Sequence, residues 1–538
     1  MSSHYLYDFI IIGSGFGGSV CAMRLSQKGY RVAVLESGKR WNKDNFPKTN
    51  WNIRKYLWMP KLRCFGIQCI TLLKGVMVLH GTGVGGGSLV YANTLVKPKQ
   101  EFFTNSNWPP GYNWEKELDP FYDLASKMLG VVPNPALFEG EEALHRVAER
   151  MGVSSTFHPT EVGVFFGEAG KPVSDPYFSG LGPDRSGCTY CGGCMVGCRH
   201  GAKNSLDQNY LFFAEKWGAK IFPETKARKI DKTENGFRVE TQSSTSFFEK
   251  HNTFEAKRVI VAAGVLGSVE LLLRNRDHYK TLPEISDRLG ENVRTNGESL
   301  LGATSFEKHR DLSRGIAIGA AFHPNSQTKI ESVRYPSGSS AMRLLGVPLT
   351  GPGSLFIRPF KLFLNSLRRL PRILKLWTVR DWAKNSIILL VMETIDYKMR
   401  LKLGRSLLQN PILKGAASGN PLPSYSPVAQ EATNILSQEL NGEPQNVISE
   451  VLLGTPATAH ILGGCGMGLT KEESVVDMTH EVHGYAGLYV CDGSVIPANL
   501  GVNPSLTITA LAERFCEQFP PQNPELFKDR TITFGPSK

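Results

Sequence analysis

Four of the chain's ten cysteines lie within eleven residues, and their spacing is that of a ligand set. Cys188, Cys191, Cys194 and Cys198 read C-x2-C-x2-C-x3-C, the bacterial ferredoxin spacing, with Arg199 where ferredoxins have proline. Four thiolates could hold an iron–sulfur cluster or zinc, although zinc sites usually separate their cysteine pairs widely. The alternative is free or disulfide-bonded structural cysteines, although disulfides between such close neighbours would be strained.

A glycine-rich turn at residues 13–18 could bind a diphosphate. It fits G-x-G-x-x-G, in which Gly13 permits a tight turn, Gly15 lets the backbone approach a pyrophosphate and Gly18 lets a helix pack on a strand. A helix that starts here directs free N–H groups and its positive dipole end at the phosphates. The turn therefore predicts a dinucleotide cofactor.

The elements that must position this turn can be read on either side of it. An apolar run at residues 7–12 predicts a strand, residues 19–27 a helix, and residues 30–35 a second strand. Glu36 ends that strand and can accept hydrogen bonds from the adenosine ribose, while it would repel a 2′-phosphate. The unit favours FAD or NAD over NADP.

A second glycine cluster at residues 81–88 indicates another close approach of backbone to a flat or phosphorylated group. Near the C-terminus, an apolar strand runs into the polar turn at Asp492 and Gly493, and Asn503 and Pro504 suit the N-cap and first position of a helix that continues through Ala512. Such a helix could be a well-capped core helix, or its positive end could face a cofactor.

These motifs resemble those of the glucose–methanol–choline (GMC) oxidoreductases, which are FAD enzymes that oxidise alcohols, and most closely the GMC-type bacterial cholesterol oxidases. The resemblance implies an α/β fold with a discontinuous Rossmann-like FAD-binding domain (1–100, 200–305 and 450–538) and an inserted α+β substrate domain (101–199 and 306–449). Because no histidine occurs from residue 81 to 93, we expect FAD to be bound non-covalently.

The resemblance also implies residue roles. His460 would take the hydroxyl proton while hydride leaves for the flavin, Asn503 would bind the same oxygen, and Glu331, with Glu393 as the second choice, would supply a carboxylate. By itself, a histidine on an apolar segment reads as a satisfied core residue. The expected FAD contacts are Gly13, Ser14, Gly15, Phe16, Gly17, Gly18, Glu36, Gly81, Gly83, Gly85, Gly86, Gly87, Ser88, Asn93, Ala263, Gly264, Asp492, Gly493, Asn503, Pro504 and Ser505.

Much of the formal net charge of +12 comes from residues 354–380, which hold seven Lys or Arg and no acid. Phe356, Phe360, Phe363 and further apolar residues form a stripe at helical spacing, and Pro359 and Pro371 should start or break helices. A basic amphipathic segment with aromatics on its apolar side is typical of an anionic membrane surface. The alternative is a pair of helices packed on the core. Nucleic acid is disfavoured because the aromatics are not interleaved with the charges.

We therefore expect a lipophilic alcohol as substrate, with a sterol as the first choice, and oxygen or an electron carrier as acceptor. Alternatives are a dehydrogenase of another long-chain or terpenoid alcohol that relays electrons through an iron–sulfur cluster, and a flavin-binding protein without alcohol turnover. With neither a signal peptide nor a transmembrane run in the sequence, we expect a cytoplasmic or peripheral membrane location.

Overall fold

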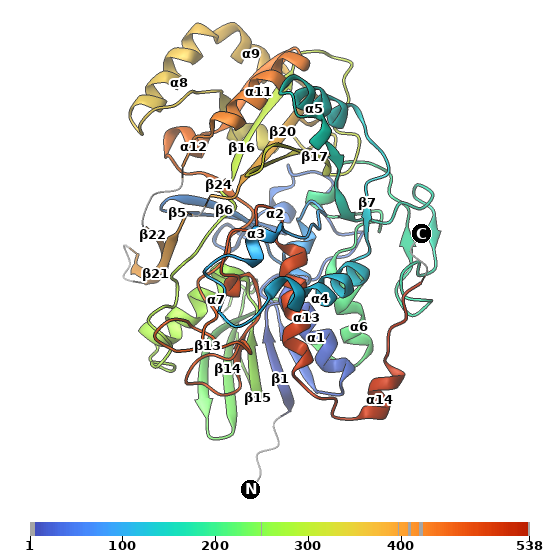
Figure 1. Ribbon diagram of the computed structural model, residues 1–538, viewed down its shortest axis with the longest axis vertical. Helices are drawn as coiled ribbons and strands as arrows, with labels where there is room; N and C mark the ends of the chain where they lie inside the picture. The colour runs from blue at the N-terminus through green and yellow to red at the C-terminus, as the bar shows by residue number, and fades with distance from the viewer. Residues whose placement is uncertain (1–5, 249, 396, 407–409, 419–422, 536–538) are drawn as a thin grey trace.

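The computed structural model describes residues 6–248, 250–395, 397–406, 410–418 and 423–535. Its first sheet joins segments that are far apart in the sequence (Figure 1). The strand order is β12-β2-β1-β15-β14-β13, and β25 also pairs with β15. The strands are β1 (Tyr7–Ile12), β2 (Val32–Leu35), β12 (Lys220–Phe222), β13 (Thr225–Thr233), β14 (Gly236–Ser243), β15 (His251–Val261) and β25 (Leu488–Val490).

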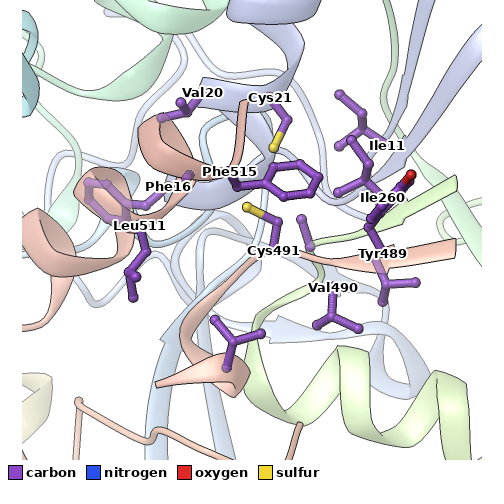
Figure 2. Packing of buried hydrophobic residues seen from close by; sticks show 14 of the residues in the cluster. Ile11, Phe16, Val20, Cys21, Ile260, Tyr489, Val490, Cys491, Leu511 and Phe515 are labelled. Atoms are coloured by element: carbon purple, nitrogen blue, oxygen red, sulfur yellow. The ribbon is translucent and has the colours of Figure 1, made fainter. Parts of the chain in front are cut away.

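The pairs among β12, β2, β1, β15 and β25 are parallel, whereas β13, β14 and β15 pair antiparallel. Helix α1 packs against α6 and α13, and α13 packs against α4. Cys21 of α1, Cys491 after β25 and Phe515 of α13 meet in this core (Figure 2). The helices are α1 (Phe16–Gln27), α4 (Trp114–Leu129), α6 (Tyr210–Lys216), α7 (Gly264–Leu273) and α13 (Ser505–Glu517).

A second, antiparallel sheet has the order β19-β23-β16-β20-β18-β17-β8. Along β20 the side chains alternate: Leu389 and Val391 pack under α5 (Glu139–Arg150) and α11 (Pro427–Glu439), whereas Leu390 faces the opposite side. The strands are β8 (His158–Pro159), β16 (Ser299–Ser305), β17 (Ile318–Asn325), β18 (Thr328–Val333), β19 (Gly346–Pro348), β20 (Ser386–Glu393) and β23 (Gly442–Val447).

Shorter elements connect and flank the two sheets. The strands are β3 (Trp58–Met59), β4 (Cys64–Phe65), β5 (Gln68–Leu73), β6 (Val76–Gly81), β7 (Val131–Pro133), β9 (Glu161–Gly163), β10 (Pro172–Val173), β11 (Arg185–Ser186), β21 (Met399–Arg405), β22 (Pro411–Ala417) and β24 (Ala457–Thr458). The helices are α2 (Ile53–Tyr56), α3 (Gln100–Phe103), α8 (Ile357–Arg368), α9 (Leu370–Thr378), α10 (Trp382–Asn385), α12 (Ile448–Leu452) and α14 (Pro524–Asp529). Short single-turn helices include η2 (Gly86–Leu89), η4 (Cys194–Val196), η7 (Ala341–Leu345) and η8 (Gly493–Val495).

The predicted α/β class and the first strand–helix–strand unit are confirmed, although α1 begins at Phe16, inside the glycine motif and three residues before the predicted start. The domain ranges stay a proposal. Strand β16 lies in the second sheet, although the prediction grouped it with the FAD-binding ranges. Residues 1–5 and 536–538 of those ranges, and with them the start of the chain, lie outside the described residues.

Helices α8 and α9 project from the second sheet (Figure 1). Pro359 lies in the first turn of α8 and Pro371 in that of α9, as the sequence predicts. Their apolar stripe faces solvent, which contradicts the alternative of a stripe packed on the core. The exposed stripe comprises Phe356, Phe360, Phe363, Leu367, Leu370, Leu374 and Trp377.

The basic residues of these helices partly face the protein instead. Arg358 is buried and donates to the backbone oxygens of Ser424 and Glu450, while Arg369 and Arg372 pair with the buried Glu443 at 2.8 and 2.7 Å. Arg358 therefore does not contribute to an exposed basic side of these helices. Within the described residues, no helix is both long and apolar enough to cross a membrane.

Candidate active site

A cavity of about 870 Å³ extends from the first glycine turn to the second sheet. Its size is that of a cofactor or ligand site. At one end it is lined by Gly13 and Glu36, in the middle by His460 and Asn503, and on the side of the second sheet by apolar residues. The apolar part is walled by Leu300, Ile318, Val333, Ile388, Leu390, Met195, Met342, Leu345 and Trp382.

The two glycine turns lie against each other at the first end of the cavity. Gly86 has a φ of +53°, and a Cβ built on it would lie 2.6 Å from Cα of Gly15. Ser14 Oγ donates to Glu36 at 2.7 Å and accepts from the Gly85 amide at 3.1 Å. The other Glu36 oxygen accepts from the amides of Gly38 and Gly83. Glu36 therefore ties the two turns together while it lines the cavity.

This end fits a dinucleotide diphosphate. Gly15 is the N-cap of α1, and no side chain caps the helix, so its positive end opens on the cavity. A Cβ built on Gly15 meets no protein atom within 4 Å, so the space in front of this backbone is open. FAD would thus be held by the backbone of both turns.

Most of the predicted FAD contacts line the cavity. They are Gly13, Ser14, Gly15, Phe16, Gly17, Glu36, Gly81, Gly86, Gly87, Ala263, Gly264, Asp492, Gly493, Asn503, Pro504 and Ser505. Five do not line it: Gly18, Gly83, Gly85, Ser88 and Asn93. Gly18 packs closely on the turn, since a Cβ built on it would lie 2.1 Å from the Gly13 oxygen. Ser88 Oγ donates to the Gly85 oxygen and accepts from the Leu206 amide. These two residues support the conformation of the glycine turns without lining the cavity.

Asp492 ends the cradle on the C-terminal side. One carboxylate oxygen accepts from the amide of Ser494 at 2.8 Å, at the N-cap of η8, and the other accepts from Ser268 Oγ at 2.5 Å. Burial raises the pKa of this carboxyl above its usual value. Asp492 thereby fixes the start of η8 beside α7 and brings Gly493 to the cavity wall.

His460 and Asn503 meet in the middle of the cavity. Asn503 Nδ2 lies 3.5 Å from Nε2 of His460 and donates to Glu331 Oε2 at 3.3 Å. Helix α13 begins at Ser505 without a side-chain cap, so the expectation that Asn503 caps it is wrong. The amide is instead engaged by Glu331 and His460, which matches the alternative that this helix start serves a site.

Glu331 and Glu393 differ in what they contact. Glu331 is fully buried on β18 and reaches the cavity through Asn503, without lining it itself. Glu393, at the end of β20, accepts from Ser426 Oγ at 2.9 Å and does not line the cavity. The structure therefore brings Glu331, and not Glu393, to the His460–Asn503 pair.

Glu298 is a site residue that sequence reasoning missed. Its carboxylate contacts Nδ1 of His460 as an ion pair and accepts from the Ala459 amide at 2.7 Å. Burial lowers the pKa of His460, but the Glu298 carboxylate and, to a smaller extent, Glu331 raise it and leave that pKa above its usual value. The signal in the sequence was an acid directly before the apolar strand 299–305.

Replacing Glu298 with Gln is expected to shift the pH dependence of kcat/KM. A histidine base works only above its pKa, so the rate falls as pH drops through that pKa. Because Glu298 raises the pKa of His460, the acid limb of the profile should move to lower pH in Glu298→Gln. A profile of kcat/KM against pH for both proteins tests this; an acid limb unmoved or moved to higher pH would contradict it.

The cysteine-rich loop does not present a metal-ligand group. Among the described residues, no three His, Cys, Asp or Glu side chains are arranged to hold a metal ion, and Cys188, Cys191, Cys194 and Cys198 are free thiols. Burial raises the pKa of the Cys188 thiol well above its usual value and that of Cys194 to about 11, which opposes thiolate formation. The described residues therefore give no support to an iron–sulfur cluster or to zinc, and they show no disulfide among these four cysteines.

The cysteine-rich loop forms part of the cavity wall and is held there by Lys203. Lys203 is buried, and its Nζ donates to the backbone oxygens of Leu89, Tyr91 and Cys194 at 2.8–3.0 Å. Lys203 thereby joins the cysteine-rich loop to the residues that follow the second glycine turn. Met195 of the loop lines the cavity. Tyr91 lines the cavity as well, with its hydroxyl donating to the Asn204 oxygen at 3.0 Å.

A dinucleotide cradle joined to a histidine–asparagine pair defines a cofactor-dependent oxidoreductase. Models of the GMC oxidoreductase family match residues 7–289 and 403–512. The chain is 43% identical over 531 residues to a cholesterol oxidase of Acinetobacter baumannii, covering 96% of this chain and 95% of that protein. It is also 43% identical to a cholesterol oxidase of Mycobacterium tuberculosis, covering 96% and 91%.

Among solved structures, pyridoxine 4-oxidase from Mesorbium loti has the same fold, with a TM-score of 0.61, 16% identity, and coverage of 95% of this chain and 99% of that chain. The chain belongs to the GMC oxidoreductase family. It is an FAD-dependent enzyme that oxidises CH–OH donors. The predicted family, cofactor and reaction class are thus confirmed.

Proposed function

We propose that this enzyme oxidises the hydroxyl group of a sterol and passes the electrons to oxygen. The observation that carries the proposal is the cavity, which continues from His460 and Asn503 into an apolar chamber under the second sheet. A rigid apolar ring system suits such walls, and relatives 43% identical over nearly the whole chain are cholesterol oxidases. When bound, FAD accepts the hydride that leaves the carbinol carbon.

The residues of the chain would bind and deprotonate the hydroxyl group. Nε2 of His460 accepts the hydroxyl proton, and the Glu298 carboxylate on Nδ1 stabilises the resulting imidazolium. Asn503 holds the same oxygen, since its Nδ2 lies 3.5 Å from Nε2 of His460 and has a second hydrogen to donate besides the one engaged by Glu331. Glu331 fixes the Asn503 amide.

The test is anaerobic mixing of the enzyme with a panel of 3-hydroxysterols, long-chain alkanols and terpenoid alcohols. We expect sterols to bleach the flavin and air to restore it. Bleaching only by alkanols or terpenoids would mean that the substrate is an alcohol of that class and not a sterol. Bleached flavin that air does not re-oxidise would favour an electron carrier as acceptor. If no alcohol bleached the flavin, the chain would be a flavin-binding protein without alcohol turnover.

We also propose that α8 and α9 dock on a bilayer, which gives the enzyme a peripheral membrane location. The stripe presents large apolar side chains to solvent, with Phe356 89% exposed, and Lys361 and Arg368 flank it for anionic headgroups. Arg343 of η7 donates to the backbone oxygens of Trp377 and Val379, and its neighbours Met342 and Leu345 line the cavity. A docked α9 would therefore sit beside the rim of the substrate chamber.

Replacing Phe360 and Phe363 with Ser is expected to weaken binding to vesicles of phosphatidylcholine and phosphatidylserine at least about tenfold, since each buried Phe contributes about 1.5–3 kcal/mol. The measurement is co-sedimentation at low salt. The matched control is Phe247→Ser with Phe248→Ser, two phenylalanines between β14 and β15 that are even more exposed. Equal losses in both double variants, or no binding of the unmodified enzyme, would contradict docking through this stripe.

A further inference from the structure

A buried lysine, which the proposed chemistry has not used, lies two residues before Glu331 on β18. Because side chains alternate along a strand, Lys329 and Glu331 share a face. Their Nζ and Oε1 atoms are 2.7 Å apart, and the side chains are 3% and 0% exposed. The two atoms are not aligned for a hydrogen bond, so the contact is an ion pair. A pair this deeply buried is costly to desolvate and calls for an explanation.

The charge of Glu331 decides which way the Asn503 amide points. An ionised carboxylate can only accept, so the Asn503 atom at 3.3 Å must be Nδ2. The amide oxygen of Asn503 is then turned away from Glu331, and it is buried without a hydrogen-bond partner among the described residues.

The orientation of Asn503 in turn selects the form of His460. Nδ2 carries only hydrogens, so its 3.5 Å contact requires Nε2 of His460 to be an acceptor. The ring proton then lies on Nδ1, where the Glu298 carboxylate contacts it. That is the tautomer in which Nε2 can take a proton.

We propose that Lys329 is a positioning residue: by keeping Glu331 ionised, it fixes the orientation of the Asn503 amide and thereby the base-competent tautomer of His460. The proposal rests on the proposed function of His460. Two other charged or titratable groups lie near these contacts. Glu298 contacts His460, and His323 on β17 is affected by the positive charge of Lys329. Neither can replace Lys329, because Glu298 is an anion engaged by His460, and His323 donates from Nδ1 to the backbone oxygen of Thr328.

Without Lys329, the buried carboxylate would lack its counterion. A buried acid in that position binds a proton and becomes able to donate. It would then donate to the amide oxygen of Asn503, which reverses the amide and turns Nδ2 away from Glu331 and His460. The oxygen now facing Nε2 would favour a proton on Nε2 in addition to the one that Glu298 engages on Nδ1, and a ring protonated at both nitrogens is not a base.

The test compares Lys329→Met with Lys329→Arg in the FAD-loaded enzyme. We expect Lys329→Met to slow flavin reduction on the order of 10²-fold through misplaced groups, while Lys329→Arg stays within about tenfold of the unmodified enzyme. The ¹⁵N shifts of the His460 ring should show the neutral Nδ1–H tautomer in the unmodified enzyme and in Lys329→Arg, and a ring protonated at both nitrogens in Lys329→Met. A neutral Nδ1–H ring in Lys329→Met would overturn the proposal.

The double variant Lys329→Met with Glu331→Leu separates positioning from mere stability, since an apolar pair can replace a buried ion pair without loss of stability. We expect it to recover the Tm lost in Lys329→Met but not the rate. Recovery of the rate along with the Tm would show that the ion pair is structural only. The tautomer measurement needs no substrate, so it stands apart from a failure of the sterol panel to bleach the flavin.

Discussion

Replacing His460 with Ala is expected to slow flavin reduction by the substrate by about 10²–10⁴-fold, the usual contribution of a general base. His460 lines the cavity beside Asn503, and the Glu298 carboxylate holds its Nδ1, which makes Nε2 the ring nitrogen that accepts the hydroxyl proton. Alanine leaves Asn503 to hold the substrate oxygen without a group to deprotonate it. The measurement is the rate constant of flavin bleaching under anaerobic stopped flow.

The variant should keep its FAD, because the diphosphate cradle is built from the two glycine turns and not from His460. The flavin spectrum and the protein-to-flavin ratio check this. His145→Ala is the control, since His145 lies on α5 with a 43% exposed side chain. A rate constant for His460→Ala within about threefold of the unmodified enzyme would mean that another group is the base.

Replacing Gly15 with Ala is expected to leave a folded protein that no longer holds FAD firmly. The new Cβ meets no protein atom within 4 Å and occupies the open space in front of the α1 N-terminus. There it would displace the diphosphate from the backbone N–H groups, and one lost hydrogen bond to a charged group, ~3 kcal/mol, lowers affinity about 10²-fold. Flavin titration of the apoprotein gives the Kd.

Gly466→Ala is the matched control, because its Cβ also meets nothing within 4 Å and the residue does not line the cavity. Both variants should unfold at the same Tm as the unmodified apoprotein. Gly17→Ala is unsuitable, since its Cβ would lie 1.8 Å from the Cys491 oxygen and would disturb the fold itself. An unchanged Kd for Gly15→Ala would exclude this backbone as the diphosphate site.

The first strand–helix–strand unit could be predicted from the sequence because its signals are local. An apolar run, three spaced glycines and an acid after the second strand all lie within about 30 residues, the span of such a unit. The resemblance extended the prediction to His460 and Asn503, which are 43 residues apart in the sequence and in contact in the structure. In these cases the spacing in the sequence, or the resemblance to the family, is enough to predict which residues lie together.

The rest depends on contacts between distant segments. Glu298 meets His460 only because β16 begins beside β24, and Asn503, which looks like an N-cap, is drawn instead to Glu331 on another strand. The cysteine spacing gave no thiol orientation and did not show that Cys188 and Cys194 are in surroundings that raise their pKa. Helical periodicity found the stripe of α8 and α9, but the side that faces solvent is set by Glu443 and Glu450, which hold the arginines.

The central claim is that hydride leaves the carbinol carbon of a sterol in the cavity between the glycine turns and the second sheet. The most direct test is anaerobic stopped-flow bleaching of the flavin by a 3-hydroxysterol with hydrogen or deuterium on its carbinol carbon. We predict full bleaching in a single turnover, slower with deuterium in the unmodified enzyme. A flavin that stays oxidised with the sterol, while the same enzyme still binds FAD fully, would contradict the claim.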